Sequence, residues 1–482
     1  MVKHGLIYFI AKLFAGAVGF LSIVLYTRML VPDEYGRYAL ILVYVNLINS
    51  LLYQWFRLGL IRYIPRYHND KGKYNNLLST VIVCYLGCCL FTLVAGGVLV
   101  LVGIQSAVQM AVTLFFLWTA AWFELSQAVQ RSNLKPVRFT MMTGLKSAAS
   151  LGFGVLALAM GYGEVGLLIG ISLGTLVANV VFIREWNIRA GWSVDRSILV
   201  ELVKYGLPLI ISGGMAYIMQ SIDRVMIGWL EDESAAGIYS VTFDFALQTV
   251  GMLMLIVNLS ALPLVIRRLE TEGYESAQGQ LTQNYQLLLG ISLPAVLGLT
   301  ILSGNITSVV FGSEYVHEAA IILPIISFAM LFQGLKSYYT DNSYQLGRTT
   351  YKQAIPVLIG IVLNVVLNMV LIPRFGLTGA AISSLTAYLC SFLANWFVAR
   401  SVFYLPLPLA ESAKIIGSSF VMGLVLFLLK GQSGLLALIC QIAVGAVVYA
   451  AMFVILNIMN ARTLLMRKLS VLRQKRLAKS DA

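Results

Sequence analysis

The sequence predicts an all-α, polytopic membrane protein with about fourteen transmembrane helices. We expect two pseudo-symmetric six-helix lobes followed by two further helices. The 482 residues are 59% hydrophobic and 11% charged, with a mean hydropathy of +0.84, whereas soluble domains carry about 25% charged residues. Apolar runs of about 20 residues, enough for a helix to cross a bilayer, recur along the chain. The runs are continuous rather than alternating, which favours helices over a membrane barrel.

The expected spans follow these runs in order. The first run resembles a signal peptide, but it lacks a clear small-residue cleavage site and continues to Leu30, so we interpret it as a span. The expected spans cover residues 6–30, 38–61, 78–102, 106–130, 140–161, 164–184, 198–229, 236–266, 281–303, 319–345, 353–373, 376–399, 410–429 and 434–460.

The distribution of cations predicts the orientation. Lys and Arg gather after even-numbered spans, as at Arg62 and Arg66, whereas loops after odd-numbered spans are often acidic, as at Asp33 and Glu34. Because cytoplasmic loops are enriched in cations, we expect both termini in the cytoplasm. The net charge of +13 largely reflects this rule. We therefore expect membrane lipids, and no nucleic acid, among the partners.

An internal repeat predicts the lobes. Gly36-x-Tyr38 returns as Gly237-x-Tyr239, with the two copies 201 residues apart. Duplicated halves are common in transporters. The expected organisation is an N-terminal lobe at 1–186, a cytoplasmic linker at 187–197, a C-terminal lobe at 198–400, the last two spans at 401–460 and a basic cytoplasmic tail at 461–482.

Polar residues inside the apolar runs indicate where function lies, since such groups usually face a cavity or a partner at membrane depth. In the second span they recur at helical spacing and predict one polar face about 16 Å long. The tenth span shows a similar pattern. The expected cavity stripe comprises Asn46, Asn49, Tyr53 and Gln54 in the second span and Gln333 and Thr340 in the tenth.

Charged residues inside the spans predict a cationic cavity. The inner cations are Lys12, Arg28, Arg57, Lys146, Arg224 and Lys336. The inner anions, fewer in number, are Glu124, Asp223, Asp244 and Asp341. An excess of cations suits an anionic cargo such as a phosphate or pyrophosphate headgroup. The alternative is that these charges pair with one another and hold helices together.

Catalytic motifs are absent from the sequence. No Walker A motif supports ATP hydrolysis, and the match to G-x-G-x-x-G at Gly161–Gly166 lies between two membrane runs rather than after a strand. The five cysteines lie in apolar runs and are interpreted as small buried side chains rather than metal ligands. We therefore expect no enzyme activity, no metal and no cofactor other than a coupling ion, H⁺ or Na⁺.

Two stretches resemble a known family. The run from Thr27 to Gly36, TRMLVPDEYG, followed by Leu58-Gly59-Leu60-x-Arg62-Tyr63, resembles the start of the Wzx-like polysaccharide flippases. These belong to the multidrug/oligosaccharidyl-lipid/polysaccharide exporter superfamily. The stretch Asp223-Arg224-x-Met-Ile-Gly228, followed by Gly237-Ile-Tyr239, resembles their second-half signature.

This resemblance implies alternating access and a cargo of oligosaccharide on polyprenyl diphosphate, moved across a bacterial inner membrane to the outer leaflet. It implies that lumen cations receive the headgroup, with Arg28, Arg57, Arg62 and Arg224 as the first candidates and Lys12, Lys146 and Lys336 after them. Asp223, Asp244, Glu124 and Asp341 are candidates for ion coupling or for pairing between lobes. The polysaccharide polymerase machinery is an expected partner.

Two other classes stay open. A cation-coupled drug exporter of the same superfamily would favour twelve spans and an acidic cavity, and a membrane glycosyltransferase would need catalytic carboxylates or a large soluble loop. A lipid II flippase is a close neighbour that the motifs do not separate from the first hypothesis. The sequence leaves open the sugar composition of the cargo, the surface polymer, the coupling ion and the oligomeric state.

Overall fold

The computed structural model describes residues 2–186, 193–347 and 349–463, and this part of the chain is helical, with no β-strand. The chain divides into two compact units. Unit 1 comprises Met1–Val241 and Asn364–Ala380, and unit 2 comprises Thr242–Leu363 and Ala381–Ala482. Most of the predicted linker and the tail beyond residue 463 lie outside the described residues. The predicted lobe boundaries stay a prediction.

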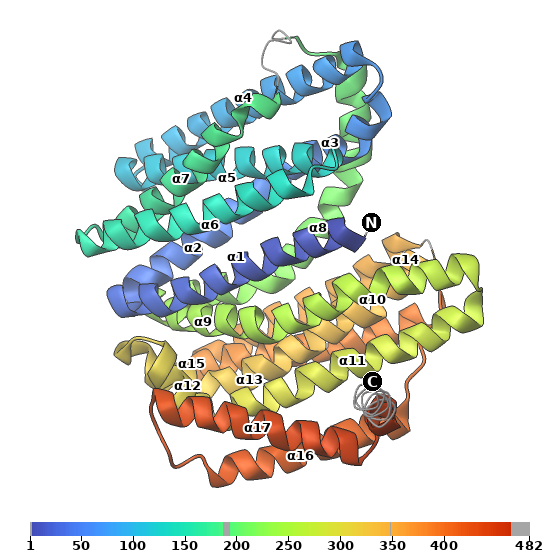
Figure 1. The fold of residues 1–482 in the computed structure, drawn as a ribbon. Helices are drawn as coiled ribbons and strands as arrows, with labels where there is room; N and C mark the ends of the chain where they lie inside the picture. The colour runs from blue at the N-terminus through green and yellow to red at the C-terminus, as the bar shows by residue number, and fades with distance from the viewer. Residues whose placement is uncertain (1, 187–192, 348, 464–482) are drawn as a thin grey trace, which may run out of the picture. The chain divides into compact units, whose positions relative to one another are not determined.

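Unit 1 is built from the first eight helices and the start of the ninth. They are α1 (Val2–Met29), α2 (Pro32–Leu52), α3 (Gln54–Tyr67), α4 (Lys71–Leu101), α5 (Ala107–Ser132), α6 (Pro136–Ala159), α7 (Gly163–Val181), α8 (Arg196–Leu230) and α9 (Glu233–Ala246). Figure 1 shows α6 lying beside α1 and α7, and these pairs are in contact.

Unit 2 contains the remaining helices, two of them short π-helices. They are η3 (Leu247–Gly251, π), α10 (Met252–Thr271), α11 (Tyr274–Ile301), α12 (Ser303–Val310), α13 (Val316–Leu335), η5 (Lys336–Thr340, π), α14 (Asn342–Leu346), α16 (Leu409–Leu428) and α17 (Leu435–Ile455). The long α15 (Ala354–Ala399) contributes to both units. In unit 2, α11 packs against α10 and α16 (Figure 1).

The predicted fold class is confirmed. Twelve helical stretches of the described chain are long and apolar enough to cross a membrane. One of them, Tyr351–Ala399, holds two predicted spans, because Gly376 breaks α15 with φ 54° and ψ −134°. Such a conformation favours glycine. Treating its two halves separately and adding the 35-residue α8, the described chain offers fourteen crossings.

The predicted continuous span at 38–61 is wrong. The structure ends α2 at Leu52 and begins α3 at Gln54, with Tyr53 between them at φ −118°. In lipid, a carbonyl freed by such a break must find another donor. The Leu52 carbonyl accepts hydrogen bonds from the Trp55 indole at 2.9 Å and the Cys88 thiol at 3.8 Å. These side chains make the break tolerable.

Glycines allow close packing between helices. A Cβ on Gly174 would lie 2.2 Å from the Ser150 nitrogen, so α7 meets the backbone of α6. The repeated glycines also touch each other. A Cβ on Gly36 would lie 1.7 Å from the Glu233 oxygen, and one on Gly237 would lie 2.1 Å from the Pro32 oxygen. Both crossings require the absence of a side chain.

The exposed surface of the helices is apolar. On α4, for example, Leu90 and Phe91 are each 62% exposed, as expected for residues that face lipid tails.

The cysteines were expected to be buried, but four are half-buried and Cys440 is exposed. Asn305, which begins a sequon-like Asn-Ile-Thr, is 9% exposed and bonds the Gln441 carboxamide at 2.8 Å.

Candidate functional site

Two of the predicted cations interact with one carboxylate in unit 1, and a third lies near one of them. Arg57 Nη1 of α3 lies 3.0 Å from Glu124 Oε2 of α5, and the two side chains are 34% and 38% exposed. Lys146 of α6 interacts electrostatically with Glu124 and with Lys12 of α1. The site therefore joins four helices, and its predicted cations outnumber its carboxylate.

Local contacts hold this cluster in place. The Lys146 ammonium lies 4.5 Å from the centre of the Phe123 ring, a cation–π contact. The Gln127 carboxamide donates to the Thr143 hydroxyl at 2.8 Å. This hydrogen bond sets the register between α5 and α6. Gln127 lies about one helical turn after Glu124, and Thr143 lies about one turn before Lys146. The register therefore brings Glu124 level with Lys146. The break at Tyr53 sets the direction in which α3 carries Arg57.

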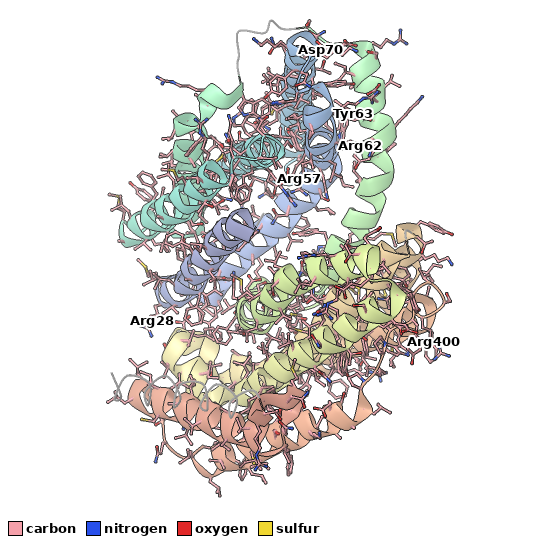
Figure 2. The ribbon with its side chains drawn as sticks, turned by 45° about the vertical axis from the view of Figure 1, so that its right-hand side comes forward. Arg28, Arg57, Arg62, Tyr63, Asp70 and Arg400 are labelled. Atoms are coloured by element: carbon pink, nitrogen blue, oxygen red, sulfur yellow. The ribbon has the colours of Figure 1, made fainter. Side chains whose placement is uncertain are left out.

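The other predicted headgroup cations lie elsewhere. Arg28 is exposed at the end of α1, sixteen residues from Lys12, which is about 24 Å of helix. Figure 2 shows Arg57 and Arg62 along α3 and Arg28 at the other end of the unit. Arg62 is exposed and stacks 4.5 Å over the Tyr205 ring. Arg224 is 9% exposed on α8. The predicted set is thus not one cluster.

Lys336 is paired rather than open. In unit 2 its ammonium lies 3.2 Å from Asp341 Oδ2, with side-chain exposures of 6% and 8%. The π-helix explains the pair, because the Asp341 amide bonds the Lys336 carbonyl five residues back, at 2.9 Å. Asn395 donates to Asp341 Oδ1 at 2.7 Å and to the Thr340 hydroxyl at 2.5 Å. The Tyr344 hydroxyl donates to Asn395 at 2.6 Å.

Asp223 has a different environment. It is fully buried in unit 1, and its Oδ1 accepts from the carboxamides of Asn364 at 2.9 Å and Asn368 at 2.7 Å. Asn368 Oδ1 is itself buried without a hydrogen-bond partner in the described structure. Two carboxamide N–H groups of α15 thus solvate one oxygen of this α8 carboxylate. Asp244, the fourth predicted carboxylate, is half-buried at the beginning of unit 2.

The expected stripe in the second span is not one face. Asn46 is exposed, Asn49 is buried, and the buried Tyr53 places its hydroxyl 3.7 Å from the Cys89 sulfur. Half-buried Gln54 accepts from the Ser50 hydroxyl at 2.5 Å across the break. The break at Tyr53 changes the direction of the helix after it, whereas Asn46 and Asn49 both precede it in α2. In the tenth span, Gln333 is half-buried and Thr340 is fully buried.

Aromatic residues of unit 1 pack on one another. Tyr85 meets Trp122 edge-on at 5.0 Å, and Trp122 stacks on Trp186 at 4.4 Å. The Trp186 indole donates to the Ser126 hydroxyl at 2.8 Å. These rings form part of the core rather than an open sugar-stacking platform. In the described chain, no group of three or more His, Cys, Asp and Glu could hold a metal ion.

Sequence reasoning missed several residues of these sites. Asn395 was hidden in an apolar run, where an isolated carboxamide was the available signal. Thr143 and Phe123 gave no signal, because a threonine and a phenylalanine are ordinary in a membrane helix. Their roles follow from the pairing of α5 with α6, which spacing alone does not determine.

Known proteins share this architecture. The solved structure of the lipid II flippase MurJ in an inward closed conformation superposes with a TM-score of 0.79 and 17% identity, over 95% of this chain and 100% of that one. At this identity the likeness establishes the fold. The class is therefore that of polytopic, all-α membrane proteins.

Sequence comparisons define the family. The profile of the polysaccharide biosynthesis proteins matches residues 25–320, and the chain belongs to that family. The resemblance to polysaccharide flippases seen at Thr27–Gly36 is confirmed.

Two curated relatives are flippases by name. The probable low-salt glycan biosynthesis flippase Agl15 of Haloferax volcanii is 21% identical over 92% of this chain and 93% of its own length. The lipid II flippase MurJ of Bacillus subtilis (strain 168) is 26% identical over 275 residues, which are 51% of this chain and 49% of that protein. The chain thus aligns with about half the length of this relative.

Proposed function

We propose that the protein flips an oligosaccharide repeat unit linked to polyprenyl diphosphate from the cytoplasmic to the outer leaflet of a bacterial inner membrane. Transport proceeds by alternating access, with both termini in the cytoplasm. The product supplies the polymerase machinery of a surface polysaccharide such as O-antigen, exopolysaccharide or capsule. Membership of the polysaccharide biosynthesis family and the similarity to named flippases support this proposal.

One observation carries the choice of cargo. Arg57 pairs with Glu124, Lys146 interacts with the same carboxylate and with Lys12, and the Arg57 and Glu124 side chains are partly exposed. Cations that present charge-assisted donors to an open space suit phosphate oxygens. A cationic drug would be repelled by the same charges, which disfavours a multidrug exporter. A lipid II flippase shares the diphosphate and stays the alternative.

Gene deletion in the bacterial host tests the proposal. We expect loss of surface polysaccharide and accumulation of complete lipid-linked repeat units in the inner membrane. Normal polymer with increased drug sensitivity would contradict the proposal, and accumulation of lipid II would select the alternative. Complementation with Arg57→Gln or Lys146→Met should fail at normal protein levels. Lys430→Gln, which removes an exposed cation over the Phe427 ring, should complement fully.

We further propose that Asp223 is the site of the coupling ion. The Asp223 carboxylate is fully buried, and a buried carboxylate can take up a proton or bind a hard cation through its oxygens. Asp223→Asn should abolish the dependence of flipping on a Na⁺ or H⁺ gradient in proteoliposomes. Unchanged gradient dependence in this variant would refute the assignment.

A further inference from the structure

One indole holds the break between α2 and α3. Trp55 Nε1 donates to the Leu52 carbonyl at 2.9 Å, across Tyr53 at φ −118° and ψ −19°. The Cys88 thiol, a weaker donor, reaches the same carbonyl at 3.8 Å. In a regular α-helix this carbonyl would accept the amide four residues on, that of Phe56. The indole satisfies the acceptor that the break leaves free, which stabilises the broken form over a continuous helix.

A second contact holds Trp55 from the side of α8. A Cβ on Gly206 would lie 2.5 Å from Trp55 Cβ, 2.9 Å from its Cα and 3.1 Å from its carbonyl oxygen. The two helices therefore meet backbone to backbone at this residue, and both belong to unit 1. The start of α3 is thus fixed at Trp55 on two sides, by the Leu52 carbonyl and by α8.

We propose that Trp55 is a positioning residue that directs Arg57 at the cluster of Glu124 and Lys146. The inference rests on the proposed function, and Trp55 acts through Arg57 rather than on the cargo itself. Arg57 follows Trp55 by two residues, and its guanidinium lies 3.0 Å from the Glu124 carboxylate of α5. In a continuous helix α3 would extend the axis of α2, and Arg57 would leave its place beside Glu124. Displacing a binding group by about 1 Å is enough to weaken a site.

Calorimetric titration of the purified full chain with UDP-glucose, a water-soluble diphosphate diester, tests the proposal. Arg57→Gln should weaken binding about tenfold, because it removes charge-assisted hydrogen bonds to phosphate. Trp55→Phe keeps an aromatic ring but removes the indole donor, and it should weaken binding about fivefold, the equivalent of one hydrogen bond. In the Arg57→Gln background, Trp55→Phe should have no further effect on the affinity, because its action passes through Arg57.

Matched controls separate position from stability. Trp118→Phe makes the same chemical change elsewhere in unit 1, where the Trp118 indole donates to the Thr92 hydroxyl at 3.0 Å. It should lower the melting temperature without changing the affinity for UDP-glucose. Gly206→Ala, which pushes Trp55 from α8, should weaken binding as Trp55→Phe does. Gly214→Ala, with nothing within 4 Å of the new Cβ, should leave the affinity unchanged.

The outcomes separate the inference from the function that it rests on. If Arg57→Gln weakens binding but Trp55→Phe lowers only the melting temperature, the headgroup site stands and the positioning role is refuted. An equal loss of affinity from Trp55→Phe in the parent protein and in the Arg57→Gln background would also refute it, since Trp55 would then act independently of Arg57. If UDP-glucose does not bind the parent protein, or binds Arg57→Gln equally well, the cluster is not a headgroup site and both conclusions fail.

Discussion

Removal of either partner of the Lys336–Asp341 pair should destabilise the protein, and removal of both should restore much of the loss. The side chains are 6% and 8% exposed, so water screens the pair little. Breaking a buried pair on one side costs about 3–5 kcal/mol, because it leaves an uncompensated charge. Lys336→Met leaves the Asp341 carboxylate with the Asn395 amide, and Asp341→Asn leaves a buried ammonium.

The double variant Lys336→Met/Asp341→Asn removes both charges and keeps similar volumes. We expect it to be more stable than either single variant, with a coupling energy of about 2 kcal/mol or more. Melting temperatures in detergent, followed by tryptophan fluorescence, give the order of the four proteins. A double variant that melts lower than both single variants would refute the reasoning. If it is stable but exports no polysaccharide, Lys336 acts on the cargo and the pairing is not its main role.

Three further predictions concern other parts of the fold. Gly36→Ala and Gly237→Ala should each lower the melting temperature, because the new Cβ overlaps a backbone oxygen and overpacking costs about 1–3 kcal/mol. Gly152→Ala, with nothing within 4 Å of the new Cβ, should not. Asn305→Ala should lower the melting temperature, because it leaves the Gly434 amide and the Gln441 carboxamide without their hydrogen-bond partner. The expected cost in stability is about 1–3 kcal/mol. An unchanged melting temperature would mean that water replaces the Asn305 side chain. Hydrogen bonds from Ser197 and the Ile198 amide lower the pKa of Asp195, the N-cap of α8. Its contribution to stability is therefore present above the ordinary carboxyl range and is lost as the pH falls below about 4. Asp195→Ala should show a smaller drop in melting temperature on acidification than the parent protein, and an equal drop would contradict this.

The fold was predictable because it follows from composition. Apolar runs as long as Lys71–Leu101 have one stable form in lipid, a helix, and the runs could be counted from the sequence. The repeat around Gly36 and Gly237 was also readable, and the structure explains it, since each glycine meets backbone of the other segment. The predicted helix ends were less accurate. For example, α11 begins at Tyr274, seven residues before the expected span.

The candidate site was predictable as a set of residues but not as an arrangement. Charged groups in apolar runs are rare, so Arg57, Glu124 and Lys146 stood out. Their convergence depends on which helices are neighbours, and spacing along one helix contains no such information. For Lys336 the structure agrees with the alternative of mutual pairing, because its partner Asp341 is five residues away. In a regular α-helix, that spacing would direct the two side chains apart.

Two departures from the regular α-helix set side-chain directions that the spacing of residues in the sequence did not predict. At Tyr53 the helix breaks four residues before Arg57, and at Lys336 a π-turn replaces an α-turn. Lipid makes an unpaired backbone group costly, so such departures persist only where other groups restore the hydrogen bonds. The Leu52 carbonyl receives two side-chain donors, and the Lys336 carbonyl keeps an amide donor at 2.9 Å. The chain can therefore reorient a charged side chain without leaving its backbone unpaired. It does so beside Arg57, which pairs with Glu124 of another helix, and at Lys336, which pairs with Asp341 of the same stretch.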